Sequence, residues 1–147
     1  MAVRILLLAA ALALSGCQRY EITLNERVIS RPPPVPTLAE LADEALATCV
    51  RQHLHDRRLG DPRRLRALVC SHAGIADLRG IELLSGLQTL GLAHNALTSL
   101  TPLFRLPALR RVDLRGNDEL TCAEVDALAA RLPEGGELLP PEACARR

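Results

Sequence analysis

The stretch GLQTLGLAHNAL at residues 86–97 places leucines at positions 87, 90, 92 and 97 and an asparagine at position 95. Amphipathic helices repeat apolar residues every three or four positions, and half-buried strands repeat them every two. In this stretch the spacing changes from three to two within a few residues. The change predicts a chain that turns onto a short strand, points Leu90 and Leu92 into the core, and leaves the strand at a bend containing Asn95.

The same spacing returns 22 residues before and 22 residues after this stretch. A shift by that period places Ala73 and Asn117 in the column of Asn95. It also aligns three apolar columns, which are Leu65 with Leu87 and Leu109, Leu68 with Leu90 and Val112, and Cys70 with Leu92 and Leu114. A fixed period in the twenties indicates a stack of similar turns, each adding one strand to a common sheet.

Residues 65–120, which carry this pattern, resemble the leucine-rich repeat family, in its short 22-residue bacterial type that is also seen in internalins. The resemblance implies an α/β repeat fold, namely a short solenoid of about three turns with parallel strands on its concave face and helical caps at both ends. We expect Asn95 and Asn117 to be structural, because an amide at the bend can donate to and accept from the backbone of neighbouring turns.

The N-terminal segment carries the clearest functional signal. Residues 1–16 combine Arg4, an apolar run and two small residues, and as a helix the ten apolar residues would span only about 15 Å, which predicts a cleaved export signal. The residues before Cys17 resemble the bacterial lipobox. This implies that Cys17 carries palmitate-type acyl chains and anchors an exported lipoprotein, in the outer membrane because Gln18 follows. The alternative is an ordinary secretory signal followed by an unrelated cysteine.

Three segments surround the repeats. They are a proline-rich, extended tether at residues 17–36, an N-terminal helical cap at residues 37–64 and a C-terminal cap at residues 121–147. Both caps are expected to begin with a capping box, formed by Thr37 with Glu40 and by Thr121 with Glu124. Asp61 and Pro62 provide a second helix start inside the first cap.

Four cysteines remain once Cys17 is assigned to lipid, and an even number favours disulfides in an exported protein. Three pairings are possible. We favour Cys49 with Cys70 and Cys122 with Cys144, since each bridge would tie a cap to the adjacent end of the repeats. The wide spacing of the cysteines argues against a zinc site or a redox pair.

The sequence offers no residue set for catalysis, since neither a Gly-rich phosphate loop nor a nucleophile elbow is present. The formal net charge of +1 and the near absence of aromatic residues argue against nucleic acid. His72 and His94 hold equivalent positions in successive turns, but two ligands alone make a poor metal site, so we expect both to face solvent. We therefore expect no enzyme, no metal and no cofactor.

Two functions remain. In the first, the protein is a monomeric, lipid-anchored, non-enzymatic module that binds an unidentified protein partner through its concave face. The residues expected on that face are Val69, Ser71, Thr89, Gly91, Ala93, Arg111, Asp113 and Arg115. In the second, it is a structural envelope lipoprotein whose N-terminal cap contacts anionic lipid or lipopolysaccharide. The basic residues of that cap are Arg51, Arg57, Arg58, Arg63, Arg64 and Arg66.

Overall fold

The computed structural model describes residues 22–24, 27–30 and 37–146. The expected export signal, the Cys17 lipidation site and most of the expected tether lie outside these residues. The chain divides into two units, Met1–Pro34 and Val35–Arg147. In the first unit, β1 (Ile22–Leu24) pairs antiparallel with β2 (Arg27–Ser30), so part of the expected tether forms a strand pair of its own.

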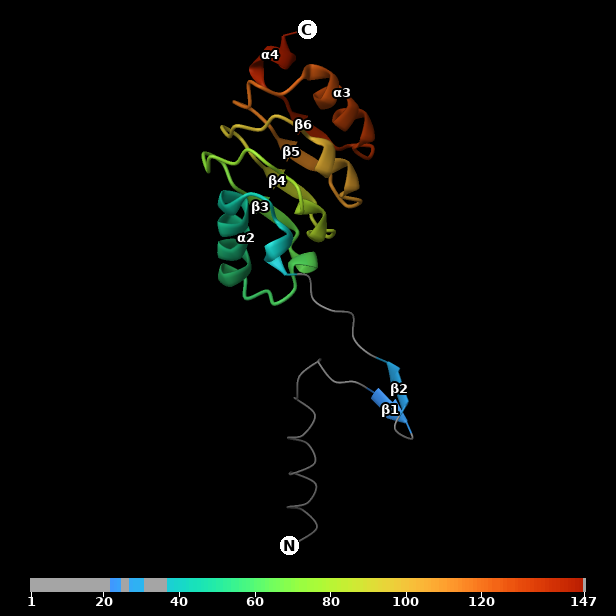
Figure 1. Ribbon diagram of the computed structural model, residues 1–147. Helices are drawn as coiled ribbons and strands as arrows, with labels where there is room; N and C mark the ends of the chain where they lie inside the picture. Colours follow the sequence, from blue (N-terminus) through green and yellow to red (C-terminus); the bar gives the residue numbers. More distant parts are fainter. Residues whose placement is uncertain (1–21, 25–26, 31–36, 147) are drawn as a thin grey trace, which may run out of the picture. The chain divides into compact units, whose positions relative to one another are not determined.

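Four short strands of the second unit form one parallel sheet in sequence order (Figure 1). They are β3 (Ala67–Val69), β4 (Thr89–Gly91), β5 (Arg111–Asp113) and β6 (Glu137–Leu139). Leu68 lies opposite Leu90, and Leu90 lies opposite Val112, which is the register that the 22-residue period predicts. The architecture is α/β, and successive turns of the chain contribute the parallel strands.

The strand β6 corrects the expectation of about three turns and of a C-terminal segment that only caps them. Leu138 of β6 lies opposite Val112 of β5, a separation of 26 residues (138 minus 112) instead of 22. The helix α3 (Cys122–Arg131) occupies most of the connection between these strands. The longer connection conceals the fourth strand from a search at a fixed period.

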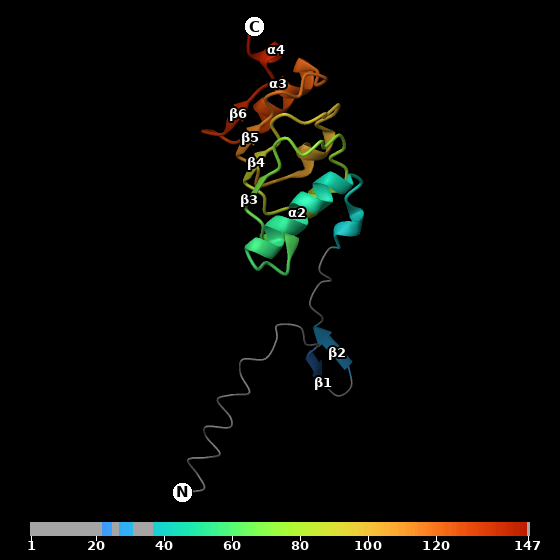
Figure 2. The ribbon, with the colours of Figure 1, turned by 90° about the vertical axis from the view of Figure 1, so that its left-hand side faces the viewer.

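Helices lie at the two ends of this sheet. Figures 1 and 2 place α2 (Glu44–Asp56) at the β3 end, and α3 and α4 (Glu142–Ala145) at the β6 end. Four short 3-10 helices complete the unit, namely η2 (Leu38–Glu40), η3 (Pro62–Arg64), η4 (Ile81–Leu83) and η5 (Thr101–Arg105). Consecutive returns pack on one another, because η4 contacts η5 and η5 contacts α3.

The first α-helix begins after Asp43, so the expected capping box at Thr37 and Glu40 is wrong. Thr37 precedes only the short η2 and makes no capping hydrogen bond with its side chain. The chain then becomes extended at Leu41, whose side chain enters the core. The carboxylate of Asp43 accepts hydrogen bonds from the first-turn N–H groups of α2 instead, at 2.9 and 3.0 Å.

The other two expected helix starts are present. Asp61 accepts a hydrogen bond from the backbone N–H of Arg63 at the start of η3. Thr121 accepts one from the backbone N–H of Glu124 at the start of α3. The Glu124 carboxylate accepts from the Leu100 backbone N–H at 3.3 Å, which ties α3 to the segment before η5.

The core contains the leucine columns, and two disulfides close its ends. Leu68, Leu90 and Val112 are fully buried beneath the sheet. Two disulfides join Cys49 with Cys70 and Cys122 with Cys144, in the pairing that the sequence favours. The first ties α2 to the end of β3, and the second ties α3 to α4. Within the described part of the chain, no helix has both the length and the apolar composition needed to cross a membrane.

Asn95 and Asn117 bridge successive turns through their side-chain amides. The oxygen of Asn95 accepts hydrogen bonds from the backbone of the previous turn, and its nitrogen donates to the carbonyls of Cys70 and Leu92. Asn117, which is fully buried, repeats this arrangement one turn later with Leu97 and Leu92. Both amides therefore satisfy backbone groups that would otherwise be left without partners at the bends.

Candidate binding face of the parallel sheet

The sheet has one buried face and one open face. Leu68, Leu90 and Val112 point into the core, while the alternate side chains point the other way. Among the residues with described side chains, Val69 is the one large apolar residue that is exposed, at 54%. Parallel sheets are normally covered on both faces, so an uncovered face that carries an exposed valine is a candidate contact surface.

The structure divides the expected face residues into accessible and covered positions. The accessible ones are Val69, Ser71, Arg111 and Arg115, while Thr89 and Asp113 are half-buried. Gly91 and Ala93 are buried, so they contribute little to any contact. Val69 accounts for Gly91, because a Cβ at Gly91 would lie 3.2 Å from Cγ1 of Val69. The apolar part of the open face is thus formed by Val69 more than by the middle strand.

Two ion pairs make the β5 end of the face charged. The guanidinium of Arg115 donates to both carboxylate oxygens of Asp113, at 2.9 and 2.6 Å, and this contact holds the pKa of Asp113 below its ordinary value. Arg111 donates to Glu137 across β5 and β6 at 2.7 Å. Sequence reasoning missed Glu137 because it missed β6. Paired charges of both signs suit a polar partner surface better than a purely anionic one.

The two histidines form a stack beside this face. The rings of His72 and His94 lie 4.4 Å apart and 10° from parallel. Both residues have positive φ angles, 55° and 56°, as does Gly116 in the next turn, so this column adopts the left-handed conformation that His tolerates better than most residues. Among the described residues, no three His, Cys, Asp or Glu side chains gather into a metal site.

The arginine cluster of the N-terminal cap is largely engaged within the protein. Arg57 and Arg66 donate to the carbonyls of Ala67 and Gly86. Arg51 pairs with Glu44 and Arg63 with Asp61. Within the described residues, Arg58 and Arg64 are exposed and have no carboxylate partner. The cluster therefore presents less free charge than its sequence indicates.

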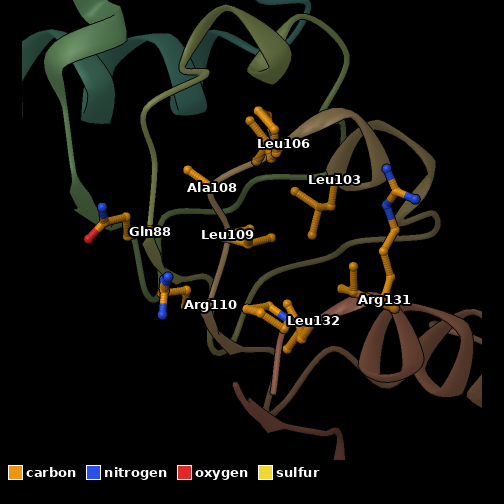
Figure 3. A pocket seen from close by; sticks show the side chains of 11 residues that line it. Gln88, Leu103, Leu106, Ala108, Leu109, Arg110, Arg131 and Leu132 are labelled. Carbon is orange, nitrogen blue, oxygen red and sulfur yellow. The ribbon is translucent and has the colours of Figure 1, made fainter. Parts of the chain in front are cut away.

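A cavity of about 320 Å³ opens between η5, the chain leading into β5, and the C-terminal end of α3 (Figure 3). Its apolar lining includes Leu103, Leu109 and Leu132, and Arg110 and Arg131 also line it. A second cavity of about 210 Å³ shares Gln88 and Arg110 with the first and includes Thr89 and Arg111 of the open face. Sequence reasoning missed this site because its walls come from separate segments with no common motif.

Comparisons with known proteins yield one structural likeness. No protein-family model matches this chain. No curated protein matches it. An internalin from Listeria monocytogenes is similar among solved structures, with 22% sequence identity and a TM-score of 0.38 over 56% of this chain and 33% of the internalin. This chain thus spans about a third of that protein, and its function is inferred from its own residues.

Proposed function

We propose that the protein is a lipid-anchored, non-enzymatic leucine-rich repeat module that binds a protein partner through the open face of its parallel sheet. One observation carries the proposal. The face lacks the covering layer that parallel sheets normally have, and it exposes Val69 beside two ion pairs. The 22-residue register and the bridging amides of Asn95 and Asn117 support the assignment to a leucine-rich repeat solenoid.

The open face predicts the chemistry of the partner. Val69 offers an apolar contact at the β3 end. At the β5 end, Arg111 and Arg115 retain exposed donors, and their partner carboxylates retain exposed acceptor oxygens. A complementary surface would place an apolar side chain over Val69 and both donors and acceptors over the ion pairs. Such pairing favours specificity more than raw affinity.

The size of the face limits the affinity. Strands are spaced by about 4.8 Å, so four short strands present only a few hundred Å², below the roughly 800 Å² that each partner buries in a standard interface. A stable complex therefore needs contacts beyond the sheet. An acyl anchor on Cys17 would offset part of this deficit, because a protein held at the membrane meets other envelope proteins at a raised effective concentration.

The test is chemical crosslinking of the full-length protein in its native envelope, followed by mass spectrometry. The face variant is Asp113→Ala/Arg115→Ala, combined in a second sample with Val69→Asp. The matched control is Asp77→Ala/Arg79→Ala, which removes the same local ion pair, of 2.6 Å, from the loop between β3 and η4. These substitutions alter exposed or half-buried side chains, so the fold should persist.

The proposal predicts a protein that crosslinks to the wild type and to the control but is lost from both face variants. Equal crosslinking of all four proteins would overturn the use of this face. Crosslinks to lipid alone would favour the second function, in which the N-terminal cap rests on an anionic surface. Because Arg58 and Arg64 are the exposed, unpaired arginines of that cap within the described chain, Arg58→Ala/Arg64→Ala tests it directly.

A further inference from the structure

The cavity between η5 and α3 combines an apolar lining with unpaired positive charge. Leu103, Leu109 and Leu128 form part of its wall, and each has only a few per cent of its surface exposed. Arg110 and Arg131 lie on opposite sides of the space, with Leu103 and Leu109 between them (Figure 3). The site thus offers two guanidinium groups around an apolar interior.

The charge of this cavity is not balanced by its own walls. No Asp or Glu is among the residues that line it. Within the described part of the chain, neither Arg110 nor Arg131 has a carboxylate partner, whereas Arg63, Arg79 and Arg115 each pair with the aspartate two residues earlier. Arginines that are free on both sides of an apolar hollow are complementary to a ligand that is both apolar and acidic.

We propose that this cavity binds a peptide segment of the partner protein in which an apolar side chain is flanked by carboxylates. The inference rests on the proposed role in protein binding. The apolar side chain occupies the space between Leu109 and Leu132, and the carboxylates accept hydrogen bonds from Arg110 and Arg131. A volume of about 320 Å³ lies at the lower end of the range for ligand sites, which suits one or two side chains.

The position of the cavity supports a partner segment that continues from the sheet. The adjoining cavity shares Gln88 and Arg110 with this one and includes Thr89 and Arg111, which belong to the open face. A segment that crosses the face can therefore pass the ends of β4 and β5 and enter the apolar space. The exposed amide of Gln88 stands at this passage and can donate to and accept from a peptide backbone.

The test uses the full-length protein in a non-ionic detergent and the fluorescence anisotropy of three labelled tetrapeptide amides. Their sequences are Glu-Leu-Leu-Glu, Lys-Leu-Leu-Lys and Glu-Ser-Ser-Glu. Only the first combines both features of the proposed ligand, so we expect it alone to raise the anisotropy in a saturable manner. Equal binding of the second peptide would overturn the role of the arginines, and equal binding of the third would overturn the role of the leucines.

Two charge-reversal variants locate the binding. Arg110→Glu/Arg131→Glu should weaken binding of the Glu-Leu-Leu-Glu peptide by about tenfold or more, since it replaces two attractions with two repulsions. The matched control is Arg58→Glu/Arg64→Glu, which changes the net charge equally at two exposed arginines that also lack a carboxylate partner among the described residues. An equal loss in the control would mean attraction by net charge alone and would overturn the site.

A third variant tests the cavity without altering charge. Ala108 is half-buried in the cavity wall, so Ala108→Trp should fill the space and abolish peptide binding. If that protein fails to fold, the smaller Ala108→Leu replaces it. Displacement of the peptide by dodecanoate at equal or lower concentration would assign the cavity to fatty acids and overturn the peptide proposal.

The two proposals fail separately. The face variant Asp113→Ala/Arg115→Ala should leave tetrapeptide binding unchanged, because neither residue lines the cavity. Crosslinking that depends on the face, together with no peptide binding, would overturn only the cavity. Peptide binding that depends on Arg110 and Arg131, together with crosslinking that ignores the face, would overturn only the role of the sheet.

Discussion

The side-chain oxygen of Asn95 accepts a hydrogen bond of 3.0 Å from the backbone N–H of Ile75, which lies one turn earlier in the chain. The same oxygen accepts from Ala73, and the amide nitrogen donates to two carbonyls. The packing of successive turns therefore depends on this one side chain as well as on leucines.

Replacement of Asn95 should be among the most destabilising single substitutions. We expect Asn95→Leu to lower the free energy of unfolding by about 2–4 kcal/mol, because buried backbone donors and acceptors lose their partners. Urea unfolding of the oxidised protein measures this effect. Gln52→Leu serves as control, since Gln52 is exposed and bonds only to Asp56. A loss below about 1 kcal/mol in Asn95→Leu would contradict the bridging role.

The carboxylate of Asp43 links stability to pH. Burial raises the pKa of Asp43, but hydrogen bonds from the backbone N–H groups of Ala76, Leu46, Asp77 and Ala45 outweigh it, so the pKa lies below its ordinary value. The stabilisation is therefore complete above the unfolded pKa of about 4 and is lost as the pH falls through the lower, folded value.

We expect Asp43→Ala to cost about 1 kcal/mol or more near neutral pH, since it removes the cap of α2 and leaves two loop N–H groups unpaired. The cost should shrink as the pH falls from 5 to 2, because the wild type then loses the same contribution. Thermal unfolding across this range, with the exposed Asp126→Ala as control, measures the difference. A cost that does not change with pH would contradict the role of the charge.

Each disulfide should stabilise one end of the sheet independently. The bridges close loops with separations of 21 and 22 residues, for which chain entropy predicts about 3 kcal/mol each. The variants Cys49→Ala/Cys70→Ala and Cys122→Ala/Cys144→Ala should show losses that add in the quadruple variant, because distant sites act independently. Urea unfolding tests additivity, and a combined loss far from the sum would mean that the two ends unfold as one unit.

Gly86 marks a close approach between the backbones of neighbouring turns. A Cβ there would lie 2.1 Å from the carbonyl oxygen of Arg63, so Gly86→Ala should destabilise the protein by about 1–3 kcal/mol. Gly60 is the matched control, because no atom lies within 4 Å of its hypothetical Cβ. Gly60→Ala should be neutral or stabilising by less than about 1 kcal/mol. Equal effects of the two substitutions in thermal unfolding would rule out the close contact as the cause.

The ion pair of Asp113 with Arg115 should matter for binding and little for folding. It is exposed on the arginine side, so its loss should change the free energy of unfolding by less than about 1 kcal/mol. Because the Arg115 guanidinium lowers the pKa of Asp113, the pair remains charged until the pH falls below about 4. Partner capture that depends on Asp113 should therefore persist at pH 5, and capture that is lost between pH 7 and 5 would implicate a different group.

The sequence predicted the register of β3, β4 and β5 because three columns of buried leucine, valine and cysteine repeat at one interval. It did not predict β6, whose separation from β5 differs by the residues that α3 requires. The start of α2 was also misplaced, since Asp43 is favoured by bonds to residues 76 and 77, which are more than 30 positions away. Such distant partners leave no local signal.

The irregular first turn has a physical explanation that the sequence alone did not reveal. An asparagine at Ala73 would face the preceding element, which is α2, and the N–H groups inside a helix are already bonded. The leucine column is likewise interrupted at Cys70 because that position forms a disulfide with α2. Both departures from the repeat are therefore adaptations to the helix at that end.

For the candidate face, alternation along the strands predicted which side chains point away from the core but not which of them remain accessible. Val69 covers Gly91, a relation between neighbouring strands that depends on the size of both residues. The cavity beside α3 was invisible because its walls meet only after folding. Sequence periodicity thus defines directions, and packing decides access.

The two disulfides leave residues 71–121 free of any covalent link among the described cysteines. This interval contains β4 and β5, whose pairing with their neighbours is equivalent from turn to turn. An in-frame duplication of residues 87–108 would add a strand there and leave both end linkages intact. In evolutionary terms, the gene can lengthen the protein in whole turns, each widening the sheet by about 4.8 Å, without acquiring another cysteine.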